Sequence, residues 1–184
     1  DIIEALILLP LVLPPVVTGF VLLWLLGNNG PVGRVLSTQF GAPVVFTPYA
    51  AIIASAIVAL PLMYQSARAA MQSLDSHGED AARSLGASAW RTFWTVTLPQ
   101  CRAGLVAGAL LSFARALGEF GATIMVAGNI PGVTTTAPLA IYFATESGDL
   151  NLAAVYAAII GMMNLVLVVG LNVWQRRISK GQKS

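Results

Sequence analysis

The sequence predicts an all-α integral membrane protein, and three observations support that prediction. Of its 184 residues, 57% are hydrophobic and only 10% are charged, whereas a soluble domain carries about 25% charged residues. Four apolar stretches are long enough to cross a bilayer, which takes about 20 residues per helix. The Lys and Arg residues gather between the second and third stretches and after the fourth, as they do in the cytoplasmic segments of membrane proteins.

The four predicted membrane spans are residues 5–26, 49–70, 103–127 and 152–174. The first contains Pro10, Pro14 and Pro15. Because proline has no backbone N–H, we expect a kink or a break at Pro14-Pro15. Broken spans are tolerated where they are buried in protein or line a water-filled cavity. Pro14, Pro15 and Thr18 are therefore candidates for a transport pathway, although the prolines also fit a plain structural kink.

The distribution of charge predicts which side of the membrane each loop faces. The basic residues of the two charged regions are Arg68, Arg83, Arg91 and Arg102 after the second span, and Arg176, Arg177, Lys180 and Lys183 after the fourth. The loop of residues 128–151 contains no Lys or Arg. Because short loops rich in Lys and Arg remain in the cytoplasm, we predict that residues 79–99 and the C-terminus are cytoplasmic.

Residues 79–99 form a charged, amphipathic segment between two apolar spans. A protein that only crossed the bilayer would not need such a segment, so it predicts a docking element for a soluble partner. A first short helix is expected to start at Glu79-Asp80, where the helix dipole favours negative charge. Gly86 permits a bend after it, and Ser88 is expected to cap a second short helix that extends to about residue 95.

The aromatic residues of this segment, Trp90, Phe93 and Trp94, are large apolar side chains of the kind that anchor protein interfaces. The alternative is an interfacial helix whose tryptophans lie in the inner leaflet. Leu98-Pro99 is expected to close the segment and to start the turn into the third span.

The same segment resembles the EAA loop of ABC importer permeases. The matching residues are Glu79-Asp80-Ala81-Ala82, Gly86, Val96 and Thr97-Leu98-Pro99. The family pattern runs Glu-Ala-Ala, three residues, glycine, nine residues, an apolar residue, one further residue and Leu-Pro. We assign Glu79 to its acidic position and Asp80 to its first alanine. In the family, this loop forms a short coupling helix that sits in a groove on the ATP-hydrolysing subunit.

Two further stretches resemble the molybdate branch of this family. They are the proline-rich run of residues 9–19, and residues 114–123 with the following Gly128-Asn129-Ile130-Pro131-Gly132. Sulfate and thiosulfate permeases are similar at these positions, but residues 121–124 and 138–142 favour molybdate. The residues that the resemblance assigns to coupling with the ATPase are Glu79, Asp80, Ala81, Ala82, Gly86, Ala87, Trp90, Phe93, Leu98 and Pro99.

The resemblance implies a type I ABC importer permease, which is a helical bundle in the bacterial inner membrane. Residues 1–184 would form its single transmembrane domain, with a cytoplasmic coupling helix. The resemblance also implies a homodimer, two ATPase subunits that hold ATP and Mg²⁺, and an external oxyanion-binding protein. Members of the family usually carry at least one further membrane helix before the position of Asp1, so we expect the N-terminal start to be missing.

Arg115 and Glu119 lie inside the third predicted span, where a charged side chain costs about 2.5–3.5 kcal/mol on insertion scales. A spacing of four residues places both on one helix face, so we expect them to pair. Ser112 lies on the same side. Two interpretations remain: the pair fixes helix packing, or these three residues line or gate the anion path. The small residues Gly104, Gly108, Ser112 and Ala116 recur every fourth position, which predicts close helix packing.

The sequence contains no metal-ligand cluster, no Ser/His/Asp set, no phosphate loop and no nucleic-acid patch. We therefore expect no catalytic residue, metal or cofactor in this chain and no nucleic-acid partner. Thr134, Thr135 and Thr136 could donate hydrogen bonds to an oxyanion, but such a run also fits a solvated loop. The alternatives to molybdate import are sulfate, thiosulfate or tungstate import, a stand-alone channel or carrier, and an intramembrane enzyme. The docking element argues against a channel or carrier, and the missing nucleophile and base argue against an enzyme.

Overall fold

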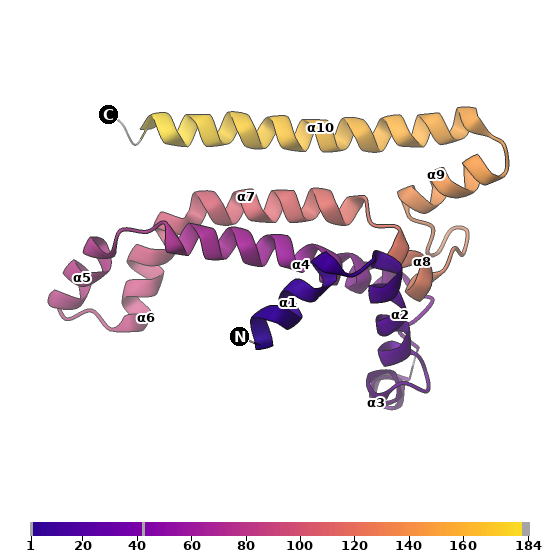
Figure 1. The fold of residues 1–184 in the computed structure, drawn as a ribbon, viewed down its shortest axis with the longest axis horizontal. Helices are drawn as coiled ribbons and strands as arrows, with labels where there is room; N and C mark the ends of the chain where they lie inside the picture. Colours follow the sequence, from indigo (N-terminus) through magenta and orange to yellow (C-terminus); the bar gives the residue numbers. More distant parts are fainter. Residues whose placement is uncertain (1, 42, 182–184) are drawn as a thin grey trace. The chain divides into compact units, whose positions relative to one another are not determined.

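The computed structural model describes residues 2–41 and 43–181, and the regular elements in these ranges are all helices (Figure 1). The helices are α1 (Ile2–Val12), α2 (Pro15–Leu26), α3 (Pro31–Phe40), α4 (Pro48–Gln72), α5 (Ser76–Ser84), α6 (Ala89–Thr92), the π-helix η1 (Phe93–Thr97), α7 (Leu98–Leu117), α8 (Gly121–Ala127), α9 (Ala137–Glu146) and α10 (Leu150–Gly181). The prediction of an all-α protein is therefore confirmed. Asp1 and Lys183 lie outside the described residues, as do the side chains of Arg176, Arg177 and Lys180.

The chain divides into two compact units. The first unit contains Asp1–Pro61 and Phe113–Val166, and the second contains Leu62–Ser112 and Leu167–Ser184. The first unit therefore holds α1, α2, α3, α8 and α9, and the second holds α5, α6 and η1. The long helices α4, α7 and α10 each contribute residues to both.

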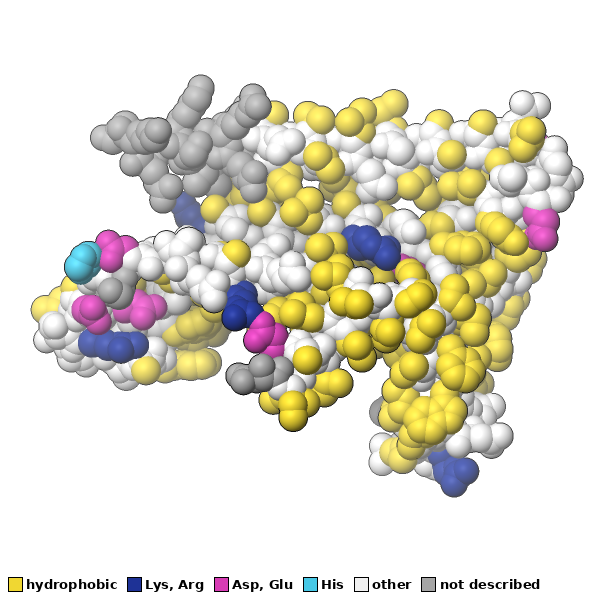
Figure 2. All heavy atoms as spheres, viewed as in Figure 1, with side chains coloured by type: hydrophobic (Ala, Val, Ile, Leu, Met, Phe, Trp, Pro, Cys, Tyr) yellow, Lys and Arg dark blue, Asp and Glu magenta, His cyan; other side chains and the backbone are white. Residues whose placement is uncertain are grey.

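Three helices of the described residues are long and apolar enough to cross a membrane. They are Pro48–Gln72, Ala89–Leu117 and Leu150–Trp174, and the bent pair of α1 and α2 makes a fourth crossing if it counts as one span. The predicted spans 49–70 and 152–174 agree closely with the first and third of these. Large apolar side chains remain exposed on α1 and α2, as Figure 2 shows, which fits helices that face lipid.

The first predicted span, residues 5–26, is not one helix. The chain bends by 120° between α1 and α2, and α2 begins at Pro15. Proline fits the first position of a helix because its missing N–H would have no partner there. Pro14 has extended backbone angles, and its carbonyl accepts from the N–H groups of Val17 and Thr18. The expected break is confirmed, and it lies directly before the second proline.

The third predicted span, residues 103–127, also differs from the structure. Helical backbone runs from Ala89 to Leu117 through α6, η1 and α7, so the turn expected at Leu98-Pro99 is wrong. The helix instead ends at Leu117, and α8 starts anew at Gly121. The N–H of Glu119 donates to the carbonyl of Ala116 at 3.1 Å, a tightened bond that terminates α7.

Glycine permits α2 and α8 to pack closely in the first unit. A Cβ added to Gly19 would lie 2.7 Å from the Cα of Ala122, and one added to Gly121 would lie 3.0 Å from the Cβ of Pro15. The buried core next to this contact comes from α2, α4 and α8 and consists of Leu22, Ala50, Ala51, Ala54, Val58, Ala122, Val126 and Ala127. The small side chains of this core allow α2, α4 and α8 to pack closely together.

The stripe of small residues on α7 packs against α4 in the second unit. A Cβ added to Gly104 would lie 2.6 Å from the Cβ of Ala70, and one added to Gly108 would clash with the Cβ of Ser66. The predicted close packing is therefore confirmed for these two glycines. Cys101, on the same helix, is a free cysteine and is only 2% exposed.

Candidate functional site

The segment expected to couple to a partner folds as the short helix α5 and, after Gly86, the first turns of the helix that runs on from Ala89 to Leu117, so the expected second short helix ending near residue 95 is wrong. Helix α5 starts three residues before the predicted Glu79, because the Asp75 carboxylate accepts from the N–H of His77 and caps it. Gly86 has a φ of +81°, a left-handed conformation that glycine adopts without steric cost. The Ser88 hydroxyl accepts from the N–H of Arg91 at 3.3 Å. The predicted bend and the predicted cap are both confirmed.

An aromatic cluster of Trp90, Phe93 and Trp94 follows that cap. The ring centroids of Trp90 and Trp94 are 5.5 Å apart, and those of Phe93 and Trp94 are 5.4 Å apart. Trp90 is 72% exposed and Trp94 is 50% exposed. Leu85, before the glycine turn, is 89% exposed. Both predicted roles, contact with an ATPase and insertion into the inner leaflet, require such an exposed apolar surface.

Glu79 and Asp80 have different surroundings, although they are adjacent. The Thr97 hydroxyl donates to Glu79 Oε1 at 2.5 Å, and Arg83 Nη2 lies 3.7 Å from Glu79 Oε2. Asp80 is exposed. Figure 2 shows acidic and basic side chains together with His77 on this part of the second unit. Glu79 therefore makes contacts inside the loop, and Asp80 is accessible to a partner.

The glycine of the family pattern also corrects the assignment of Glu79. Three residues separate Gly86 from the Glu-Ala-Ala positions of the pattern, and counting back places those positions on Asp80, Ala81 and Ala82. The assignment of Glu79 to the acidic position is therefore wrong by one residue. Asp80 stands there instead, and Glu79 precedes the motif.

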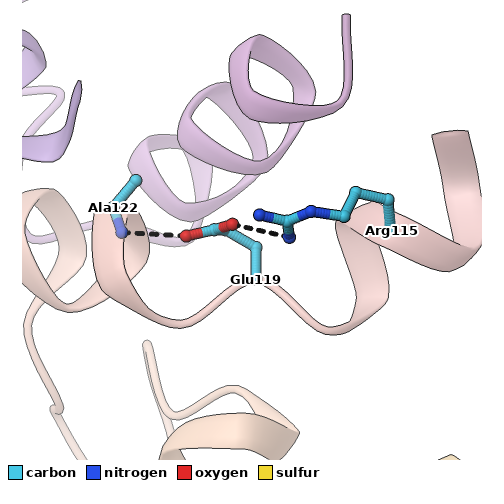
Figure 3. Close-up of polar contacts among 3 residues, drawn as sticks. All are labelled: Arg115, Glu119 and Ala122. Carbon is cyan, nitrogen blue, oxygen red and sulfur yellow. Dashed lines mark hydrogen bonds and ion pairs between the residues drawn. The ribbon is translucent and has the colours of Figure 1, made fainter. Parts of the chain in front are cut away.

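A second charged site lies where α7 ends and α8 begins (Figure 3). Arg115 Nη1 donates to Glu119 Oε2 at 2.8 Å, which confirms the predicted pair. The N–H of Ala122 donates to Glu119 Oε1 at 2.9 Å. The Glu119 side chain is 1% exposed, whereas that of Arg115 is 37% exposed. Both carboxylate oxygens of Glu119 thus have partners in the chain, which favours the role in packing over the role in gating.

The contact with Ala122 is missing from the sequence prediction. Glu119 satisfies one of the first N–H groups of α8, which would otherwise have no partner inside the helix. Its negative charge also lies at the positive end of the α8 dipole. The available signal was an acidic residue two positions before Gly121, but predicting residues 103–127 as one unbroken span left it unused.

The remaining pathway candidates lie in different surroundings. Pro15 lies beside Gly121, and so next to the start of α8. Thr18 and Ser112 are buried, and their hydroxyls have no hydrogen-bond partner in the part of the chain that the structure describes. Ser112 belongs to the second unit, whereas Arg115 and Glu119 belong to the first. Pro15 and Glu119 therefore both lie at the start of α8, and Ser112 belongs to the other unit.

A cavity of about 490 Å³ lies in the first unit, between residues of α4, α7, α9 and α10. Its walls are mostly apolar, with Ser55, Glu119 and Thr136 as the polar members. No Lys or Arg lines it. The cavity therefore offers an oxyanion the hydroxyls of Ser55 and Thr136 but no positive charge, and the Glu119 carboxylate is part of its wall.

The threonines of the loop after α8 hold that loop together. The Thr134 hydroxyl accepts from the N–H of Ile130 at 2.9 Å, and the Thr135 hydroxyl donates to Asn129 Oδ1 at 2.6 Å. The hydroxyls of Thr134 and Thr135 are occupied within the loop, whereas the Thr136 hydroxyl is buried and has no hydrogen-bond partner among the described residues. Among the described residues, no group of three His, Cys, Asp or Glu side chains is placed to hold a metal ion.

Comparison with known proteins places this architecture among transport proteins. The YvgM protein of Bacillus subtilis, named as a molybdenum transport system permease, is 47% identical over 165 residues, which are 90% of this chain and 73% of that protein. The molybdenum transport permease ModB of Haemophilus influenzae is 43% identical over 98% of this chain and 81% of its own. The sulfate transport permease cysT of Chlorokybus atmophyticus is 37% identical, over 93% and 59%.

A solved structure shows the same fold. The crystal structure of a bacterial ABC transporter that imports the acidic polysaccharide alginate matches with a TM-score of 0.71 at 19% identity. The match covers 96% of this chain, and the chain spans 65% of the length of that one. The family described as binding-protein-dependent transport system inner membrane component matches residues 1–184. The chain therefore belongs to this family of inner-membrane components of binding-protein-dependent transport systems.

Proposed function

We propose that the chain is the translocation subunit of an ATP-driven importer that carries molybdate into the cytoplasm. The observation that carries the proposal is the higher similarity to molybdenum permeases, at 47% and 43% identity, than to a sulfate permease at 37%. The resemblance of residues 9–19 and 114–123 to the molybdate branch supports the same cargo.

The loop of residues 79–99 couples the chain to a separate ATPase subunit that binds ATP and Mg²⁺. The exposed groups Asp80, Leu85 and Trp90 support this role, because they present an acidic and apolar surface on α5, at the turn after it and at the first residues of the helix that starts at Ala89. ATP binding pulls on this loop, the spans open outward to an external binding protein that carries the oxyanion, and hydrolysis resets them inward. No catalytic residue or cofactor of this chain takes part.

Two copies of the chain enclose the route, with residues 1–184 as one transmembrane domain in each. The described residues hold three spans, or four with the bent pair, and a second copy supplies further spans around the aqueous path. The loop of residues 79–99 and the C-terminus face the cytoplasm, as the placement of Lys and Arg supports. The broken first span with Pro14, Pro15 and Thr18 is the part of each copy next to the path, because broken spans are tolerated where they line a water-filled cavity.

The second candidate cargo is sulfate or thiosulfate, and tungstate is a third because it shares the tetrahedral dianion shape of molybdate. The similarity to the sulfate permease over 93% of the chain supports this candidate. A stand-alone channel or carrier would need no docking loop.

The test is uptake by proteoliposomes that contain this permease with its own ATPase and binding protein. We expect uptake of labelled molybdate that requires ATP and stops with a non-hydrolysable ATP analogue. Labelled sulfate and unlabelled tungstate as a competitor measure cargo preference. ATP-dependent uptake of sulfate but not of molybdate would show that the proposed cargo is wrong. Uptake without ATP would show that the chain is a channel or carrier instead of part of an ATP-driven importer.

A further inference from the structure

Helix α5 is attached to the start of the spanning helix by direct contacts, as well as through the loop that connects them. The Thr97 hydroxyl donates to Glu79 Oε1 at 2.5 Å, and the two residues are 18 positions apart. Gly78 of α5 also lies close to two side chains of the following helix: a Cβ added to it would lie 3.0 Å from Gln100 Nε2 and 3.3 Å from Val96 Cγ1. All of these residues belong to the second unit.

The chemistry of the contact makes it the strongest link between these helices. A hydroxyl that donates to a carboxylate forms a short, charge-assisted bond about twice as strong as a neutral one. The Glu79 side chain is 29% exposed, so water competes for it less than for a fully exposed carboxylate. Its other oxygen faces Arg83 at 3.7 Å, and the Arg83 side chain is 60% exposed.

The covalent path between the same helices is longer. It passes through Gly86, whose φ is +81° and around which an added Cβ would meet no atom within 4 Å. Backbone bonds from the Gly86 N–H to the Arg83 carbonyl at 2.9 Å and from the Ala87 N–H to the Ala82 carbonyl at 3.0 Å close this turn onto α5 itself. The bond between Glu79 and Thr97 bypasses that turn.

Thr97 also stands where the hydrogen bonding of the helix changes. It is the last residue of the π-helix η1, and the N–H of the next residue, Leu98, donates to the carbonyl of Phe93, five positions back. A π-turn interrupts the regular α-helical ladder and is often found at functional sites. The hydrogen bond between Glu79 and Thr97, called the clasp below, therefore joins α5 to the one described π-helix, from which α7 continues into the membrane.

We propose that Glu79 and Thr97 are positioning residues that transmit movement of α5 to the spanning helix α7. The proposal rests on the proposed coupling function. The proposal gives the two adjacent acidic residues different roles. Asp80, which is exposed at the acidic position of the motif, contacts the ATPase. Glu79 transmits the resulting movement to α7. Loss of the clasp leaves the ATPase bound and active but uncouples hydrolysis from transport.

The test compares three threonine variants in the complete importer, reconstituted with its ATPase and binding protein. Thr97→Val removes the hydroxyl and keeps the shape, and Thr97→Ser keeps the hydroxyl. Thr95→Val is the matched control, because the Thr95 hydroxyl lies in the same π-helix but donates only to the Arg91 carbonyl of its own helix. The measurements are co-purification of the ATPase, ATP hydrolysis, molybdate uptake and hydrogen exchange of the α5 amides.

We expect Thr97→Val to retain the ATPase and to hydrolyse ATP, while the uptake per ATP falls about tenfold, the factor that ~1.4 kcal/mol represents. The exchange of the α5 amides should rise by a similar factor. Thr97→Ser should restore both quantities, and Thr95→Val should leave both near the wild-type values. Unchanged uptake per ATP in Thr97→Val, or loss of the bound ATPase from that variant, would overturn the proposal.

The two proposals fail in different ways. If the wild-type importer carries sulfate instead of molybdate, the cargo is wrong, and the clasp is then tested on sulfate with the same variants. If the wild-type chain transports without an ATPase, the coupling function fails and the clasp fails with it. If wild-type transport is ATP-driven and α5 exchanges equally in Thr97→Val and Thr97→Ser, the clasp alone is wrong.

Discussion

Glu119 and Glu79 make similar kinds of contact, but Glu119 is more deeply buried than Glu79. Each has an arginine four residues away, at 2.8 Å for Glu119 and 3.7 Å for Glu79. Each also accepts from one further donor, the Ala122 N–H or the Thr97 hydroxyl. The Glu119 side chain is 1% exposed and that of Glu79 is 29% exposed.

The depth at which each glutamate is buried decides how much its contacts contribute to stability. Removing one partner of a buried ion pair leaves an uncompensated charge and costs about 3–5 kcal/mol, whereas an exposed pair contributes about 0–1 kcal/mol. Glu119 therefore holds the start of α8 in place as part of the fold. The ion pair of Glu79 with the exposed Arg83 contributes little to stability, so Glu79 is not needed to hold the fold together.

The largest expected effect belongs to the buried site. Glu119→Ala leaves Arg115 without its carboxylate and the Ala122 N–H without its acceptor, so we expect a loss of about 3–5 kcal/mol of stability. Thermal unfolding of the detergent-solubilised protein, followed by size-exclusion chromatography, measures it. The double variant Arg115→Met/Glu119→Gln removes the charges together and should recover part of the loss. Wild-type stability of Glu119→Ala would contradict a structural role for the pair.

The next prediction concerns the turn at Gly86, in the region that contains the more exposed Glu79. Gly86→Pro cannot adopt a φ of +81°, because the proline ring fixes φ near −65°. It also removes the N–H that donates to the Arg83 carbonyl at 2.9 Å. We expect uptake to fall more than about tenfold, with a local cost above ~1 kcal/mol, while the subunit still inserts into the membrane.

The control for that variant is Gly86→Asn, since asparagine retains the N–H and tolerates the left-handed conformation. Uptake by proteoliposomes and the amount of subunit in the membrane are measured side by side. Normal uptake by Gly86→Pro would count against a coupling role for the loop.

A smaller effect is expected where α2 meets α8. Gly19→Ala places a Cβ 2.7 Å from the Cα of Ala122, so one helix must shift, at a cost of about 1–3 kcal/mol. Gly161→Ala on α10 is the matched control, because a Cβ there meets no atom within 4 Å. That control should be neutral or stabilise the helix by up to about 1 kcal/mol. Equal melting temperatures for the two variants would show that the α2–α8 contact is not tight.

The smallest effect is expected for the exposed arginine. Arg83→Gln removes the charged partner of Glu79, but the Arg83 side chain is 60% exposed, so stability should change by less than about 0.5 kcal/mol. Arg115→Gln is the comparison, and it should cost several times more because Glu119 is buried. If both substitutions cost the same, burial is not what separates the two sites.

Local signals predicted the local features of both regions. The spacing of Arg115 and Glu119 predicted their pairing, Ser88 predicted a cap, and Pro14-Pro15 predicted a break, because each depends on residues close in sequence. The bond from Thr97 to Glu79 spans 18 positions. No periodicity in a single sequence reports a contact of that range.

Hydropathy also failed to predict that the helix is interrupted at Glu119. Residues 118–120 lie between two apolar stretches, so the average over a window of about 20 residues treats them as part of one span. The structure ends α7 there because Glu119 bonds forward to the Ala122 N–H and its own N–H bonds back to Ala116. A buried charge that caps a new helix looks, in the sequence alone, like a charge inside a longer one.

The burial of Cys101 has a practical consequence for mapping membrane topology. The chain has a single cysteine, and its thiol is shielded within the packed helices of the second unit. Impermeant maleimide reagents added to intact cells should therefore leave the native protein unmodified. Cysteines introduced one at a time into the turns can then report their sidedness on an otherwise unaltered polypeptide.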